Sequence, residues 1–108
     1  MADYYHDVWQ VIQIQSDRYG TVFKVLAGWY GGYLNGDSWQ LNSGIEKIDF
    51  VDGQHYFIGY SGSTYICSPH TQRFSGLTSS IYNNICQQPD VDICVISDIQ
   101  ELYEFLKR

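Results

Sequence analysis

Residues 49–68 read DFVDGQHYFIGYSGSTYICS and contain two turn signals between residues that favour strands. The pair Asp52-Gly53 suits a two-residue β-turn because both central positions need a positive φ, which glycine adopts freely and aspartate tolerates better than most residues. Ser61-Gly62 is a weaker signal of the same kind. The two turns predict consecutive hairpins, and hence the centre of an antiparallel sheet.

Two-residue turns would also fix which residues lie opposite each other. The first turn places Phe50 opposite His55 and Ile45 opposite Tyr60, and the second places Phe57 opposite Ile66. Since side chains alternate across a sheet, one apolar face is expected to hold Ile48, Phe50, Phe57 and Ile66. The other face would mix tyrosines with charges and hold Ile45, Lys47, Asp49, Tyr56, Ile58, Tyr60, Tyr65 and Cys67. A shift of one residue at a turn would exchange the faces.

The N-terminal part of the chain predicts three further strands. Residues 8–15 (VWQVIQIQ) and 21–29 (TVFKVLAGW) are rich in β-branched and aromatic residues and should form a hairpin. In the second of these strands one face holds Phe23, Val25, Ala27 and Trp29. Asn35-Gly36 is a strong turn signal before a short strand at 38–42.

The C-terminal third predicts two helices around one strand. Apolar residues recur every four positions within residues 75–88, which is typical of a helix, and residues 91–96 (VDICVI) read as a short strand. Residues 97–108 (SDIQELYEFLKR) have an apolar stripe. Ser97 and Gln100 fit a capping box, in which each side chain would bond the other residue's backbone amide.

The order of these elements predicts an α+β fold. It would have an antiparallel sheet of about five to six strands, with two helices in the C-terminal third packed on one face. A length of 108 residues fits a single globular domain, residues 1–108, and a hydrophobic content of 44% supplies a core. No apolar run approaches the ~20 residues that span a bilayer, and Met1–Gln10 is polar. The three cysteines cannot all pair within one chain. We therefore expect a cytoplasmic protein with free thiols and no membrane partner.

Charge narrows the class of partner. Twelve acidic against six basic residues give a net charge of −6. This argues against direct nucleic-acid binding, which requires lysine and arginine at phosphates. It favours a protein partner with a basic surface, although acidity also serves solubility. Five acids near the C-terminus are candidate contacts, either as a strip that occupies a basic groove or as a solvated helix face: Asp90, Asp92, Asp98, Glu101 and Glu104.

Aromatic residues supply a second set of candidate contacts. Ten tyrosines and three tryptophans exceed what a core of this size easily holds, and exposed rings suit binding. The glycine-rich segment 28–44 contributes Trp29, Tyr30, Tyr33 and Trp39. The sheet contributes Tyr56, Tyr60 and Tyr65. Alternatively, segment 28–44 is a meander whose rings pack on the sheet.

Cysteine and histidine chemistry is expected to play no part. Cys67-x-x-His70 with Cys86 and Cys94 has metal-ligand residue types, but structural zinc usually takes two tight pairs, so no metal or other cofactor is expected. A nucleophile formed by Cys67 with His70 or His55 is the third functional hypothesis. Nothing in the spacing enforces it, and the chain is expected not to be an enzyme.

The leading hypothesis is a small acidic inhibitor that binds a basic, nucleic-acid-handling enzyme. Examples of this class are phage anti-defence proteins of the anti-CRISPR kind, which act in the host cytoplasm, and immunity proteins against nuclease toxins. The alternative is a protein that binds or sequesters a nucleotide signal between Trp29, Tyr33 and Trp39. An unpaired edge strand could also support a homodimer.

Overall fold

The computed structural model describes residues 3–31 and 36–106, and within them it has eight strands, two α-helices and one 3-10 helix. The strands are β1 (Asp3–Tyr5), β2 (Val8–Ser16), β3 (Gly20–Trp29), β4 (Ser38–Leu41), β5 (Ile45–Val51), β6 (Gln54–Gly59), β7 (Thr64–Cys67) and β8 (Val91–Ile96). The helices are η1 (Pro69–Thr71), α1 (Gly76–Cys86) and α2 (Ile99–Leu106). The α+β class and the two C-terminal helices are therefore confirmed.

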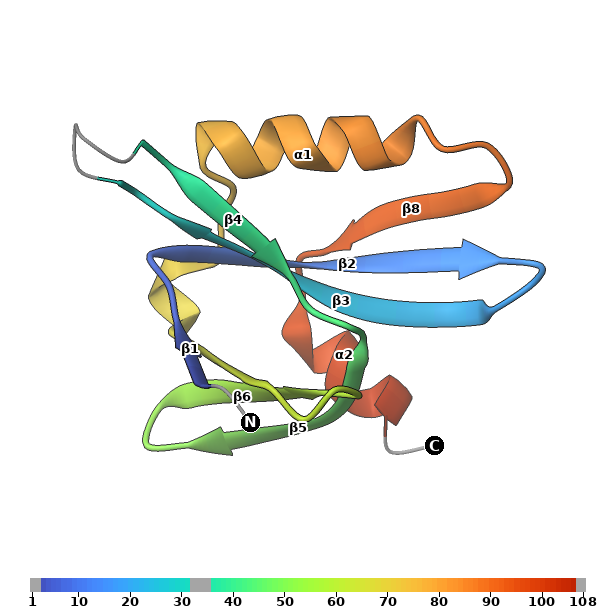
Figure 1. The fold of residues 1–108 in the computed structure, drawn as a ribbon. Coiled ribbons are helices and arrows are strands. Elements are labelled where there is room, and N and C mark those ends of the chain that lie inside the picture. Colours follow the sequence, from blue (N-terminus) through green and yellow to red (C-terminus); the bar gives the residue numbers. More distant parts are fainter. Residues whose placement is uncertain (1–2, 32–35, 107–108) are drawn as a thin grey trace.

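The strands form two four-stranded sheets, where the sequence indicated one sheet of five to six strands. Sheet A has the order β1-β7-β6-β5 and sheet B the order β4-β3-β2-β8. All neighbours are antiparallel except β1, which pairs in parallel with β7. Figure 1 shows the two sheets as stacked layers with crossing strands. Each sheet has one strongly apolar face, and stacking removes both faces from water.

The core lies between the sheets and is completed by α2. From sheet B it takes Trp9, Val11, Phe23, Val25 and Ala27, and from sheet A it takes Ile45, Phe57, Tyr65 and Cys67. Ile99 and Leu102 of α2 belong to this core, and α2 packs against β5 and β8.

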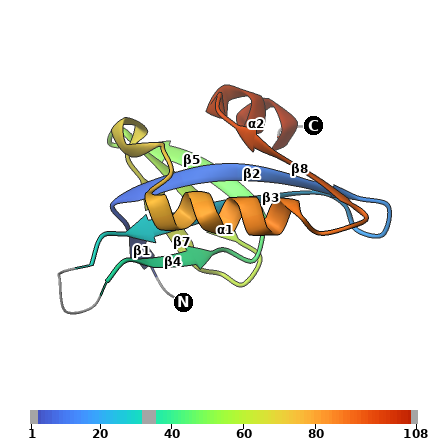
Figure 2. The same cartoon turned by 90° about the horizontal axis from the view of Figure 1, so that it is seen from above.

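The outer face of sheet B is covered by α1, which packs against β3, β4 and β8 (Figure 2). The helix approaches sheet B so closely that a Cβ on Gly28 would lie 2.8 Å from Cγ2 of Thr78. The central strands β2 and β3 are therefore largely buried on both faces. This double burial explains why Val8 and Ile12, on the α1 side of β2, are as inaccessible as Val11 on the core side.

The first central turn has the predicted register and the second does not. Phe50 lies opposite His55, as expected from a two-residue turn at Asp52-Gly53. The second turn has three residues, 60–62, and is closed by a 2.9 Å bond from the Gly59 amide to the Ser63 carbonyl. The prediction of a two-residue turn at Ser61-Gly62 is thus wrong by one residue.

That single-residue shift exchanges the faces of β7. Phe57 lies opposite Tyr65 and not opposite Ile66, so Tyr65 and Cys67 point into the core. Tyr65 is only 1% exposed. A second irregularity occurs between Ile45 and Lys47, where β5 bulges, and Ile45 consequently lies opposite Gly59 instead of Tyr60.

The chain crosses from sheet B to sheet A through three residues. The first of them, Asn42, is buried, and its Oδ1 accepts a 2.9 Å hydrogen bond from the backbone amide of Val25. This side-chain bond extends the pairing of β4 with β3 by one residue. Gly44 follows with φ +131°, and a Cβ there would lie 2.8 Å from the ring of Tyr60. Only glycine fits this position without strain.

Both helices have side-chain caps at their N-termini. Ser75 and Thr78 form a reciprocal capping box at α1, and the helix begins at Gly76, inside the predicted range. At α2 the expected capping box of Ser97 is wrong, because Oδ1 of Asp98 accepts the bond from the Gln100 amide at 3.0 Å. None of the helices in residues 3–31 and 36–106 is long and apolar enough to cross a membrane.

Replacing Leu102 with alanine tests the role of α2 in the core. Leu102 is fully buried, so the cavity left by Leu102→Ala should lower the free energy of unfolding by about 2–5 kcal/mol. The exposed neighbour Glu104 provides a control, because Glu104→Ala should change that free energy by about 0.5 kcal/mol or less. Urea denaturation of both variants measures this, and equal stabilities would contradict the placement of α2.

Candidate functional site

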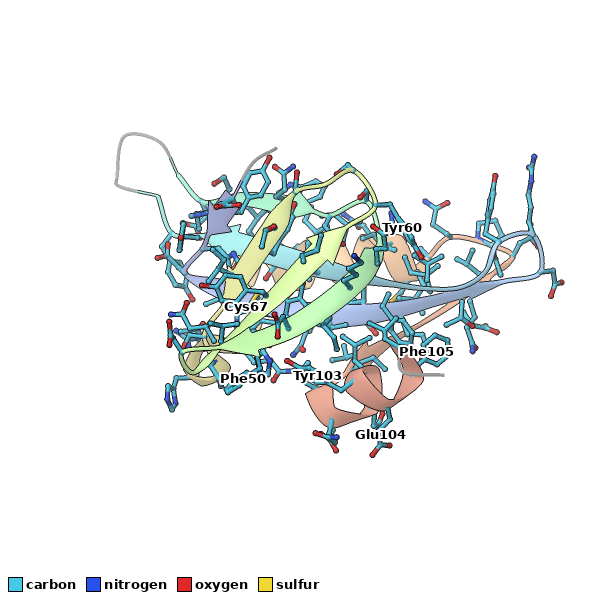
Figure 3. The ribbon with its side chains drawn as sticks, turned by 90° about the horizontal axis from the view of Figure 1, so that it is seen from below. Phe50, Tyr60, Cys67, Tyr103, Glu104 and Phe105 are labelled. Carbon is cyan, nitrogen blue, oxygen red and sulfur yellow. The ribbon has the colours of Figure 1, made fainter. Side chains whose placement is uncertain are left out.

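Apolar side chains are exposed on both flanks of α2. Phe50 and Val51 lie at the end of β5, and Phe105 lies on α2 itself; Phe50 is 52% exposed and Phe105 is 40% exposed. Figure 3 shows Phe50, Tyr103 and Phe105 along this side, with Glu104 pointing outward from the helix. We call this region the α2 surface. It consists of Phe50, Val51, Gln100, Tyr103 and Phe105, together with the exposed acids Asp49, Asp98, Glu101 and Glu104.

A hydrogen-bonded network fixes one flank of the α2 surface. The Tyr103 hydroxyl donates to the Asp49 carbonyl at 3.2 Å, and Nδ1 of His55 lies 3.0 Å from the same hydroxyl oxygen. A hydroxyl has one proton and a carbonyl can only accept, so both bonds exist together only if Nδ1 donates. His55 is then the Nδ1–H tautomer, and its Nε2 is an acceptor.

The rings around His55 form a depression of ≈ 360 Å³ lined by Phe50, His55, Gln100 and Tyr103. The ring centroid of His55 lies 5.0 Å from that of Phe50 and 5.8 Å from that of Tyr103. Burial lowers the pKa of His55 below its usual 6.5, because the charged imidazolium is poorly solvated there. We call this depression the His55 pocket. Its walls are three aromatic rings and the Gln100 amide, and none of them is charged at neutral pH.

The other flank of α2 has a narrower groove with carboxylates at its rim. Phe105 packs edge-on against Phe23, with ring centroids 4.8 Å apart. The groove has a volume of ≈ 240 Å³ and is also lined by Glu101 and Glu104. Exposed aromatic surface and negative charge therefore lie side by side on both flanks of the helix.

The five predicted acids are divided between two surfaces. Asp98, Glu101 and Glu104 are exposed in or just before α2. Asp90 and Asp92 instead line an open polar depression with Asp17, near the β2–β3 turn. Asp90 and Asp92 lie at the start of β8 and Asp98 follows its end, and this six-residue strand is about 20 Å long. No group of acidic, cysteine or histidine residues within 3–31 and 36–106 is arranged to hold a metal ion.

The predicted aromatic contacts are likewise dispersed. Tyr30, Trp39 and Tyr60 are exposed, whereas Tyr56 is half-buried and Tyr65 is in the core. Trp29 is half-buried and its Nε1 donates to the Tyr5 carbonyl at 2.6 Å. Tyr33 lies outside the described residues.

Cys67 has a histidine neighbour, but it is neither His70 nor His55. Nε2 of His6 lies 3.1 Å from the Cys67 sulfur. Burial raises the pKa of the thiol and lowers the pKa of His6 to about 4, partly offset by the nearby Asp7. Both shifts favour the neutral partners, which is the opposite of what an activated thiolate needs. This pair is therefore suited to packing rather than to nucleophilic chemistry.

Several residues of the α2 surface were missed by the sequence reasoning. Phe50 was assigned to an apolar core face, and Tyr103 and Phe105, as well as His55 of the adjoining pocket, were not considered as contacts. The available signal was local: Phe50 and Val51 directly precede the Asp52-Gly53 turn, and the last residues before a tight turn are at the rim of a sheet. Their closeness to α2 depends on packing between elements that are distant in sequence.

Acidification should destabilise the protein through His6. The pKa of His6 is about 4 in the folded protein and 6.5 in the reference state, so the unfolded chain binds more protons below pH 6.5. The contribution of neutral His6 to the free energy of unfolding is then fully present above pH 6.5, and it decreases as the pH falls toward 4. Between about pH 7 and pH 5 we expect a loss of about 1–2 kcal/mol from this residue. His6→Gln should show a clearly smaller loss in urea denaturation, while the exposed control His70→Gln should behave like the wild type.

Alkylation should distinguish the three thiols. Cys67 is buried, whereas Cys86 and Cys94 are exposed. Iodoacetamide should therefore modify Cys86 and Cys94 in the native protein, and should modify Cys67 only after denaturation. Peptide mass spectrometry reads out each site, and rapid native labelling of Cys67 would restore the nucleophile hypothesis.

Comparison with known proteins identifies no relative of this chain. No protein-family model, no curated protein and no solved structure matches this chain. The features that bear on function are the chemistry of the α2 surface and of the His55 pocket beside it.

Proposed function

We propose that this protein binds a partner protein with a basic surface through its α2 surface. The partner class that fits best is a nucleic-acid-handling enzyme, whose basic groove would be blocked by the bound acidic protein. A phage anti-defence protein of the anti-CRISPR kind, or an immunity protein against a nuclease toxin, would act in this way. The observation that carries the proposal is the combination of exposed rings and carboxylates on one helix and the adjoining hairpin.

The two components of this surface would have different roles. Exposed Phe50 and Phe105 can be desolvated by a partner and would supply most of the binding energy. Asp98, Glu101 and Glu104 would steer association and select a partner of opposite charge. Lys47 lines a neighbouring depression with Glu46, so the surface is acidic overall without being uniformly so.

The scaffold suits such recognition. The rings are held by β5 and by α2, which is anchored in the core by Ile99 and Leu102. A rigid surface loses little conformational freedom on binding, which favours affinity. Free cysteines in the described part of the chain also favour a reducing compartment such as the cytoplasm for this activity.

The nucleotide-binding alternative has less support. It required Trp29, Tyr33 and Trp39 to enclose a base, but Trp29 packs against the core and its indole N–H is bonded to Tyr5. Three depressions of ≈ 490, ≈ 360 and ≈ 430 Å³ on the described surface are lined by residues other than Trp29 and Trp39. A titration with nucleotides that changed Trp39 fluorescence would favour this alternative over protein binding.

Charge reversal on α2 tests the proposal. Affinity capture from host lysate, followed by mass spectrometry, identifies the partner. The Glu101→Lys/Glu104→Lys variant should then bind that partner at least about tenfold more weakly, because attraction is replaced by repulsion. Binding of the wild type should weaken as salt is raised, and the captured enzyme should lose nucleic-acid binding when the complex forms.

The acids of the distant polar depression provide a matched control. Asp90→Lys/Asp92→Lys makes the same change in net charge away from the α2 surface, and it should reduce affinity by less than about threefold through long-range charge alone. Equal effects of the two double variants would show that net charge, and not the α2 surface, governs binding. Failure to capture any basic protein at low salt would reject the proposal.

A further inference from the structure

We infer that the His55 pocket receives the guanidinium group of an arginine side chain presented by the partner protein. The inference rests on the proposed function and names the chemistry of one contact within it. It is drawn from three features of the pocket: hydrogen-bond acceptors, aromatic faces and the charge of its rim.

The acceptors come from His55 and Gln100. Because Nδ1 of His55 donates to Tyr103, the lone pair of Nε2 is free to accept. Nε2 has no hydrogen-bond partner among the described residues and is not one of their buried unpaired atoms. The side chain of Gln100, which also lines the pocket, offers a carbonyl oxygen. A ligand that donates two or more N–H groups would satisfy both positions.

The aromatic faces favour a flat cation. The Phe50 ring is about half-exposed and tilted against the His55 ring at 57°. Tyr103 supplies a further ring at the pocket wall. A guanidinium can stack on such a face and still donate in its own plane, whereas an ammonium is a compact, strongly hydrated charge without a preferred plane. The geometry therefore favours arginine over lysine.

The electrostatic environment agrees with a cationic ligand. Burial keeps His55 neutral near pH 7, so no cation occupies the pocket wall. Asp49 and Asp98 flank the pocket through their neighbours: the Asp49 carboxylate accepts from the Phe50 amide at 2.8 Å, and the Asp98 carboxylate accepts from the Gln100 amide at 3.0 Å. Both carboxylates lie near the edge of the pocket and outside its lining, and their negative charge disfavours an anionic ligand relative to a cation.

The position of the pocket links it to the proposed interface. Phe50 and Tyr103 belong to the α2 surface, and Figure 3 shows both on the flank where α2 meets the β5–β6 hairpin. An arginine of a basic partner would therefore reach the pocket while other basic residues face Glu101 and Glu104. A basic protein that binds nucleic acid supplies such arginines in its groove.

A probe experiment tests this inference directly. Nuclear magnetic resonance titration of the intact protein would use N-acetyl-arginine methylamide, with the lysine analogue as a probe of equal charge. Arginine should cause saturable shifts of the His55 ring and Gln100 side-chain signals, with at least about threefold weaker binding of the lysine analogue. Absence of shifts at His55 and Gln100, or equal binding of the two probes, would overturn the inference.

Ring variants inside the His55 pocket and outside the α2 surface give a matched comparison. Phe50→Ala should weaken arginine binding by about two- to fivefold, because one cation–π face is lost. Tyr19→Ala removes an exposed ring near the β2–β3 turn, outside the α2 surface, and should leave arginine binding unchanged. Both rings are exposed enough for the variants to fold, and equal effects would overturn the inference.

The outcomes separate this inference from the proposed function. A protein that captures a basic partner in the charge-reversal assay but does not bind the arginine probe would reject the guanidinium pocket alone. A protein that binds the arginine probe in the pocket but captures no basic partner would reject the proposed function and leave a guanidinium site.

Discussion

Burial of Trp9 between the two sheets is the interaction on which the rest of this structure depends. Its ring lies 5.5 Å from Phe57 and 5.8 Å from His55, both in the opposite sheet. Its Nε1 donates to the Ser68 carbonyl at 2.7 Å, and its own carbonyl accepts from the Arg73 amide at 2.8 Å. One residue thereby joins sheet B to sheet A and to the segment that leads into α1. A buried tryptophan removes roughly 150–250 Å² from water, which few other side chains match.

The same packing gives the α2 surface its shape. The ring of Trp9 packs against the ring of His55. His55 is hydrogen-bonded to the Tyr103 hydroxyl, which in turn donates to the Asp49 carbonyl. The exposed ring of Phe50 rests against His55. The pocket is consequently built on strands and a helix instead of on loops. This arrangement holds recognition groups in place before a partner arrives.

Local signals predicted local structure well. The Asp52-Gly53 turn gave the correct register of β5 and β6, since its backbone conformation depends on those two residues. The helix predicted from the four-residue apolar repeat, which is α1, and the strand predicted at 91–96 were likewise confirmed, because each depends on a pattern within one element. Ser61-Gly62 failed because a three-residue loop satisfies the same residues equally well. The shift of one position moved Tyr65 from a predicted contact into the core.

Relations between distant segments were not predictable in this way. Strand β1 is only three residues long, and it is a strand because β7 pairs with it. The division into two sheets depends on the crossing at Gly44, where the positive φ and the closeness of the Tyr60 ring, which is distant in sequence, leave no room for a side chain. The candidate site shows the same limit. The acids at positions 90–104 are close in sequence, but the length of β8 distributes them over two surfaces. Phe50 and Tyr103 are 53 positions apart in sequence, and the fold brings them together around His55.

The position of β2 in sheet B has a consequence for synthesis on the ribosome. Val11 pairs with Ile96, 85 residues later, and at about 5–20 residues per second the ribosome needs roughly 4–17 s to make that partner. During this interval the edge of β2 that later pairs with β8 lacks that strand. Residues 8–15 are strongly β-forming and carry no charge. Such a segment readily pairs with another nascent chain. A growing polypeptide of this kind is a natural client for chaperones that shield unpaired strands until translation is complete.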